Sequence, residues 1–263
     1  ISFNAANLNN NLLVVAVTAL TLTVKVLSTT SLVAEGPIAS AAFTVRGKKS
    51  EVPLTGHTNQ SYAIEEWYSD IAQSEVFGGM KVSDVAVSLP STGFATIDLT
   101  FSGKDLTSKG TSAYYTSPAS ASTTGVVAAV NGAVIVNGLP VAVITDASFT
   151  IARAIESGTV VGSNSVVDLF TGNITASGSL SVYFEDAAFR DFFDNETEVS
   201  VVLAMTTSGD KAADGVSFCM PRVKFSDFSK SESQTNVTAS SNFTALLNTI
   251  TTAGLPATTI SVQ

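Results

Sequence analysis

The alternation of apolar and polar residues is clearest in the stretch Val82-Ser-Asp-Val-Ala-Val-Ser-Leu-Pro90 and in Phe94-Ala-Thr-Ile-Asp-Leu-Thr-Phe-Ser-Gly-Lys-Asp-Leu106. In the first, Val85, Val87 and Leu89 alternate with small polar residues. In the second, the apolar positions run from Ala95 to Phe101. A period of two places such residues on one face of a β-strand. Both stretches therefore predict strands with one face on a core and the other towards a more polar environment.

The same period recurs along the chain. It appears in residues 20–26, 146–151, 179–184 and 199–206. Two Asn-Gly pairs, Asn131-Gly132 and Asn137-Gly138, predict turns, since both residue types accept a positive φ at little cost. The pattern predicts an all-β protein.

Helix is expected only in short pieces. The best candidate runs from Asp186, a potential N-cap, to about Asn195, with Phe189, Phe192 and Phe193 spaced to pack against a sheet. The stretch Ser61–Phe77 fits a helix or a strand, and we prefer strand. The expected fold class is therefore all-β with one or two short helices.

A faint internal repeat suggests two domains. Val82–Pro90 resembles Ile144–Ala152, and each copy is followed by a second strand and an acidic break. The second copy carries an insertion, Arg153–Thr175, which the first lacks. The Ser/Thr-rich segment Thr111–Thr124 is typical of a connection between domains. We predict domains at 1–118 and 119–263.

Composition excludes several classes of function. The net charge is −9, and only 13% of the residues are charged, about half of the usual ~25%. Stable binding of nucleic acid is not expected, because phosphate contacts need a basic surface; the one basic cluster, Arg46-Gly-Lys-Lys49, is interpreted as a solvated loop. No segment has the eighteen or so apolar residues of a membrane-spanning helix.

Catalytic and metal sites are not expected either. The single cysteine, Cys219, lies in an apolar strand-like run, and the single histidine, His57, lies in a loop without a nucleophile motif. A His/Cys metal site needs several such ligands. Asp186, Asp191 and Asp194 could supply paired carboxylates for a glycosidase, but solvated charge beside a helix is the ordinary role of such residues. We predict no enzyme, no metal and no cofactor.

Several segments together resemble the major tail proteins, or tail tube proteins, of long-tailed bacteriophages, in the group with two tandem tube-type domains. The resemblance runs from about Ser61 to Leu247 and depends on the order of its segments. These are Tyr62–Gly79 with the strands ending at Asp105, Gly125–Gly132 with Thr145–Ile151, Val160–Asn164 with Asp168–Phe170, Gly178–Phe193, and Phe218–Phe225.

The resemblance implies two tandem β-sandwich or barrel-like domains and a structural role in the virion. Subunits would form rings, trimeric with pseudo-sixfold symmetry rather than hexameric, and the rings would stack into the tail tube through which DNA is ejected. It also implies tape measure, tail terminator and distal tail proteins as partners, and assembly in the cytoplasm of the bacterial host. The alternative that remains open is a secreted or cell-surface β-sandwich adhesin.

Two sets of site residues follow. A channel that conducts DNA should not be basic, so Asp84 and Asp98 are candidates for the channel lining. The insertion 153–175 is rich in aliphatic residues that would be a hazard if exposed in a monomer. It is therefore expected to mediate contacts between subunits or rings, with Val160, Val161, Val166, Leu169 and Phe170 as the candidate residues.

Overall fold

The computed structural model describes residues 3–38, 41–56, 58–123, 125–141, 143–185, 187–233, 235–249 and 255–263. It is almost entirely β, as predicted. The elements are β1 Leu12–Val17, β2 Leu22–Val26, β3 Ser50–Glu51, β4 Tyr62–Tyr68, β5 Gln73–Pro90, β6 Thr96–Ser102, β7 Asp105–Gly110, η1 Ala129–Asn131, β8 Gly132–Val136, β9 Leu139–Pro140, β10 Ile144–Gly158, β11 Asp168–Tyr183, α1 Ala188–Asp194, β12 Val199–Thr206, β13 Gly215–Phe225, β14 Ser229–Glu232, β15 Val237–Ala245 and β16 Ser261–Val262.

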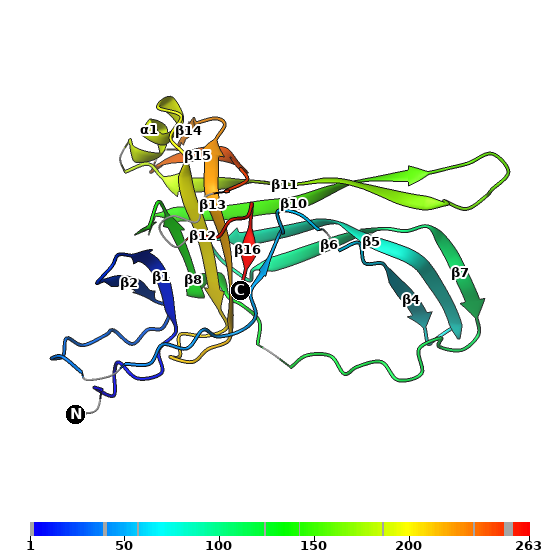
Figure 1. The fold of residues 1–263 in the computed structure, drawn as a ribbon, viewed down its shortest axis with the longest axis horizontal. Helices are drawn as coiled ribbons and strands as arrows, with labels where there is room; N and C mark the ends of the chain where they lie inside the picture. The colour runs from blue at the N-terminus through cyan, green and yellow to red at the C-terminus, as the bar shows by residue number, and fades with distance from the viewer. Residues whose placement is uncertain are drawn as a thin grey trace.

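The body of the molecule is one antiparallel sheet that curls over a single core. The strand order is β5-β10-β11-β15-β13-β12-β8, and β15 forms the corner because it pairs with both β11 and β13. An isolated bridge, Phe94 to Ala128, joins the segment before β6 to the segment before η1 and β8. The result is barrel-like (Figure 1).

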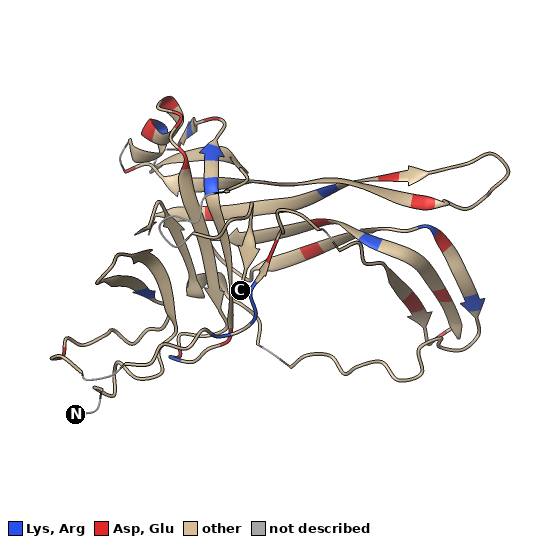
Figure 2. Ribbon diagram, in the orientation of Figure 1, with Lys and Arg blue, Asp and Glu red and all other residues tan. Residues whose placement is uncertain are grey.

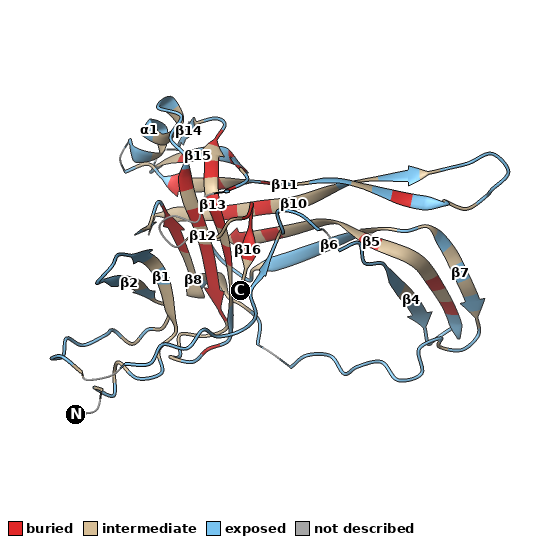
Figure 3. Ribbon diagram, viewed as in Figure 1, coloured by how far each residue is buried: buried red, intermediate tan, exposed pale blue. Residues whose placement is uncertain are grey.

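The core lies between the two sides of this curled sheet. Phe149 of β10 and Phe218 of β13 meet across it with their ring centroids 5.0 Å apart. Val87 and Leu89 of β5 belong to the same buried cluster. Residues on both sides of position 118 therefore share one core, and the buried residues are concentrated in the body (Figure 3).

Two arms project from the body, because β5 and β10 separate beyond the pair Asp84–Ala152. The three-stranded arm consists of β4, residues 73–80 of β5, and β7. The hairpin arm is residues 153–175, in which β10 and β11 continue to pair with each other alone as far as Gly158–Asp168. Figure 1 shows both arms on the same side of the body.

Several local expectations can be compared with the structure. The helix appears as α1, with Phe189 and Phe192 against Phe225 of β13; Asp186 lies outside the described residues. Residues 62–68 form a strand, as we preferred. The expected strand over 20–26 begins only at Leu22, because residues 18–21 form the turn from β1 and leave Leu20 98% exposed.

The two Asn-Gly pairs differ in backbone conformation, and only one of them forms the predicted turn. Asn137 and Gly138 both have positive φ, 51° and 76°, and form the predicted tight turn between β8 and β9. Asn131-Gly132 does not form such a turn, since Gly132 has φ −81° at the end of η1. A Cβ at Gly132 would lie 3.2 Å from Leu89 Cδ2. This glycine therefore serves close packing of β8 on β5.

Candidate functional site

One face of the four-stranded layer β6-β5-β10-β11 carries only small residues. Residues paired in register point to the same side of a sheet, so the register defines this polar face. In the part of the chain described, its members are Asp84, Ala86, Ser88, Pro90, Thr96, Asp98, Thr100, Asp146, Ser148, Thr150, Ala152, Thr175, Ser177, Ser179 and Ser181. None is buried. The opposite face of β5, β10 and β11 packs on the core.

The polar face is acidic. It carries three aspartates, Asp84, Asp98 and Asp146, and no Lys or Arg within the set above. Both residues predicted from sequence as channel-lining candidates thus lie on it. Partial burial raises the pKa of Asp146, because desolvation penalises the carboxylate. Between strands, the hydroxyls of Ser148 and Ser179 lie 3.0 Å apart.

A shallow groove opens where β5 and β10 separate. Its lining includes Ser83, Asp84, Arg153 and Asn173. Arg153 Nε is buried and has no hydrogen-bond partner among the described residues. Arg153 lines this groove but is not a member of the polar face, because it follows Ala152, which is one.

The edges of this layer are open. β6 has β5 on one side and no partner strand on the other in the described chain, and β15 covers the outer edge of β11 only from Ala176 onwards. On the face of β6 opposite the polar one, Ile97 and Leu99 are 52% and 55% exposed. Open edges with apolar side chains are typical of strands that pair with another chain.

The hairpin arm holds the residues predicted for contacts between subunits. The insertion 153–175 is mostly strand, with only residues 159–167 between β10 and β11. Val160, Val161 and Phe170 are exposed, Val166 is half-buried, and Leu169 is 2% exposed. Leu169 is thus buried by its own chain, because its side chain points to the opposite side of β11 from that of its neighbour Phe170.

Three polar contacts, which together we call the latch, join the start of β11, next to the hairpin loop 159–167, to β5 and to the turn between β6 and β7. Lys81 Nζ donates to the carbonyl of Leu169 at 2.8 Å, and Lys104 Nζ donates to that of Val167 at 3.0 Å. Lys104 also forms an ion pair of 2.8 Å with Asp168, and it is the main cause of the lowered pKa of that carboxyl. Sequence reasoning missed the latch, since two of its acceptors are main-chain carbonyls.

Groups of catalytic type are not assembled in the described residues. Burial raises the pKa of the Cys219 thiol to about 11, so it is a packed side chain and not a thiolate. No group of three or more His, Cys, Asp or Glu residues suited to a metal ion occurs there. His57 lies outside the described residues. No described helix has the length and apolar character needed to cross a membrane.

These features define an all-β protein with open sheet edges and one sheet face made of small, mostly polar residues. The chain belongs to the phage tail tube protein family, whose model matches residues 18–245. The match extends the resemblance seen in the sequence towards the N-terminus. The protein is thus a structural component of a phage tail.

Comparisons with curated proteins and with solved structures give no further information about function. No curated protein matches the chain. A solved structure described as the anti-feeding prophage (AFP) baseplate, 6-fold symmetrised, contains a chain with 8% sequence identity and a TM-score of 0.30. The similarity covers 48% of this chain and 92% of that one. At that TM-score the likeness supports no argument about function.

Proposed function

We propose that this subunit polymerises into stacked rings that form the tail tube, and that the polar face lines the channel through which DNA is ejected. The single observation that carries the proposal is the composition of that face, which has three aspartates and no basic residue. DNA phosphates bind Lys and Arg and are repelled by carboxylates. A smooth surface of Ser, Thr, Ala and Asp therefore lets a duplex slide without being held.

Rings close by pairing of sheet edges between copies. The edge of β6 is free on one side of the layer, and on the other side the outer edge of β11 is free over residues 168–175, where β11 runs into the hairpin arm. Pairing one with the other around a ring satisfies their main-chain groups and buries Ile97 and Leu99. A closed barrel leaves no unpaired edge.

The width of the channel bears on the number of subunits. Strands about 4.8 Å apart and tilted by about 40° give a barrel whose backbone diameter is roughly 2 Å per strand. Three copies of this four-stranded layer give a barrel of roughly 24 Å, which side chains narrow below the roughly 20 Å of B-form DNA. Six copies give a barrel of roughly 48 Å by the same geometry.

A trimeric ring with pseudo-sixfold symmetry, expected from the sequence, needs eight channel strands from each chain and hence two tube units, at 1–118 and 119–263. The body has a single core, and its channel layer has four strands. We therefore favour six subunits in each ring over three.

Stacking of rings uses the hairpin arm. Its exposed Val160, Val161 and Phe170 lie near the latch, which holds the outer part of the arm in place. In a tail, the ends of the tube would meet a terminator and a distal tail protein, and the channel would hold a tape measure protein during assembly in the host cytoplasm. The proposed role of the subunit is structural and includes no catalysis.

Negative-stain microscopy of the purified protein at increasing concentration tests the proposal. Hollow tubes or rings support it. Monodisperse monomers at all concentrations would instead favour the adhesin, and turnover of a substrate would favour an enzyme.

A further inference from the structure

The three-stranded arm and the connection that follows β7 contain most of the tyrosine and tryptophan residues of the chain. Four of the five tyrosines and the only tryptophan lie there. All are substantially exposed: Tyr62, Trp67, Tyr68, Tyr114 and Tyr115. Tyrosine and tryptophan are enriched in the energetically dominant parts of protein interfaces. Tyr62 and Tyr68 lie on the same side of β4 as Glu66, and Trp67 lies on the other side. The arm therefore has the composition of an interface.

The same arm carries an unfavourable pair of charges. Glu66 of β4 lies directly opposite Glu75 of β5 in the register, and like charges at such positions repel. Lys109 of β7 is opposite Glu75 on the other side, yet no ion pair within 4 Å joins either glutamate to a cation in the part of the chain described. Figure 2 shows the acidic residues on these arm strands. The surface therefore favours a cationic partner.

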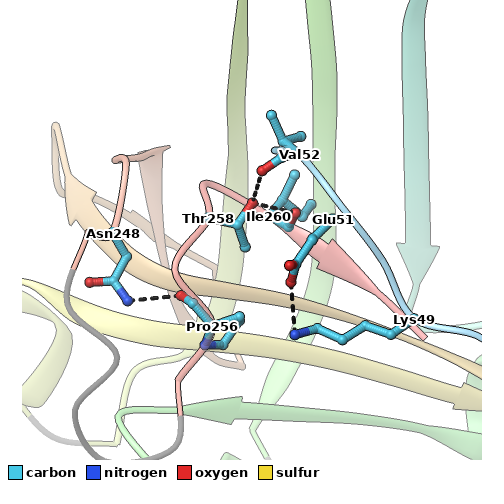
Figure 4. A network of polar contacts seen from close by, with 7 residues as sticks. All are labelled: Lys49, Glu51, Val52, Asn248, Pro256, Thr258 and Ile260. Carbon is cyan, nitrogen blue, oxygen red and sulfur yellow. Dashed lines mark hydrogen bonds and ion pairs between the residues drawn. The ribbon is translucent and has the colours of Figure 1, made fainter. Parts of the chain in front are cut away.

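The chain has one basic cluster, Arg46-Gly-Lys-Lys49, and all four residues are exposed. It directly precedes β3, which pairs with β16 of the body. Several hydrogen bonds hold this part of the chain in place, and one of them is donated by Arg46 Nη1 to Asn11 Oδ1 at 2.7 Å. Gln263 Nε2 donates to the Arg46 carbonyl at 3.0 Å, and Thr258 Oγ1 donates to the Val52 carbonyl at 2.7 Å. Figure 4 shows the latter contact beside the Lys49–Glu51 ion pair.

The two surfaces do not meet within one copy. In Figure 1 the β4–β5 turn lies at the far end of the arm, whereas β16, the partner of β3, lies in the body. Within one molecule the acidic aromatic surface and the basic cluster are therefore far apart. A contact between different patches of identical subunits is heterologous, and such contacts propagate around rings or along filaments.

We propose that the three-stranded arm of one copy docks on the Arg46–Lys49 cluster of a neighbouring copy, with Glu66 and Glu75 facing its cations. The partner is thus a second copy of this chain. The proposal rests on the self-assembly proposed above and adds the surfaces that meet. The lysine side chains also pack on the exposed aromatic rings, where a cation is attracted to the ring face.

Charge reversal tests the contact. The double variant Lys48→Glu/Lys49→Glu should raise the critical concentration for tube assembly by about tenfold or more, because the new carboxylates face Glu66 and Glu75. Lys25→Glu, an exposed charge reversal on β2, is the matched control and should assemble like the wild type. Sedimentation of tubes over a range of protein concentrations gives the values, and circular dichroism checks that each variant is folded.

The decisive test is a variant in which the charges of the two surfaces are exchanged, so that opposite charges face each other again. Adding Glu66→Lys and Glu75→Lys to the double variant should return the critical concentration towards that of the wild type. If the Lys48→Glu/Lys49→Glu variant assembles like Lys25→Glu, or if the swapped charges restore nothing, the docking proposal is wrong while tube formation stands. If the wild-type protein forms no tubes or rings, it is the proposed function that fails.

Discussion

The ammonium group of Lys81 on β5 donates a hydrogen bond of 2.8 Å to the main-chain carbonyl of Leu169 on β11, 88 residues further along the chain. Lys81 is only 6% exposed. Its side chain therefore connects the two arms beyond the point where they diverge, since Leu169 lies at the start of β11 next to the hairpin loop. The position of the hairpin arm depends on this contact and on the neighbouring contacts of Lys104.

Replacing Lys81 by Met tests that dependence. The variant keeps the apolar stem but leaves the Leu169 carbonyl without its donor, which should lower the free energy of unfolding by about 1–3 kcal/mol. Lys109→Met, at an exposed site on β7, should change it by less than about 0.5 kcal/mol. Urea denaturation measures both values. Equal effects of the two substitutions would show that the latch contributes nothing.

Substitutions of two neighbouring residues in the hairpin arm should have different effects, one on tube assembly and the other on the stability of the subunit. Phe170 is 61% exposed and Leu169 is 2% exposed. Phe170→Ala should change the free energy of unfolding by less than about 1 kcal/mol, yet weaken tube assembly, because the ring is lost from the stacking surface. Leu169→Ala should cost about 2–5 kcal/mol of subunit stability. Normal polymerisation of the Phe170 variant would move the stacking role to another segment, with residues 36–61 as the next choice.

Glu65 should make the stability of the segment that follows β7, residues 111–123, depend on pH. Its carboxylate accepts hydrogen bonds from Ser74 Oγ and Tyr114 N, each at 2.6 Å, and from Tyr115 N at 3.0 Å. These bonds, that of Ser74 first, hold the pKa of Glu65 below its usual value. The stabilisation is therefore complete above the unfolded-state pKa of about 4.3 and is lost as the pH falls through the lower folded-state pKa.

Hydrogen exchange of residues 111–123 measures this effect. In the wild type, exchange should accelerate as the pH falls through the folded-state pKa of Glu65, beyond the intrinsic dependence of exchange on pH. Glu65→Gln should already exchange faster at neutral pH and lose the extra dependence. A variant as well protected as the wild type at neutral pH would contradict the role of this carboxylate.

The charge of the polar face should control how tubes interact with DNA. Asp98→Lys places a cation on that face, so assembled tubes should bind short duplex DNA and release it as the salt concentration rises. Glu232→Lys makes the same change of charge on β14, away from the polar face. Fluorescence anisotropy of labelled duplex with each kind of tube makes the comparison. Equal binding by both variants would place Asp98 outside the channel.

The period-two pattern predicted much of the fold, because burial on one side of a sheet is recorded in alternate residues. It assigned Asp84 and Asp98 to a polar strand face correctly. It could not separate Leu169 from Phe170 within the hairpin arm, since both are apolar and only the pairing of β10 with β11 shows which one faces its own chain.

Other features left no pattern in the sequence. The burial of Lys81 depends on a carbonyl that every residue possesses. The open edge of β6 depends on which strands are neighbours in the sheet, and strand order is a property of the whole chain. The pairing of Glu66 with Glu75 likewise required the register of the β4–β5 hairpin.

A cryo-EM reconstruction of tubes assembled from the purified protein tests the proposed channel most directly. We expect a hollow tube with six copies in each ring, whose channel wall is the polar face of β6, β5, β10 and β11, with Asp84, Asp98 and Asp146 exposed in it. A channel lined by another face of the subunit, or one whose wall carries a net positive charge, would contradict this assignment.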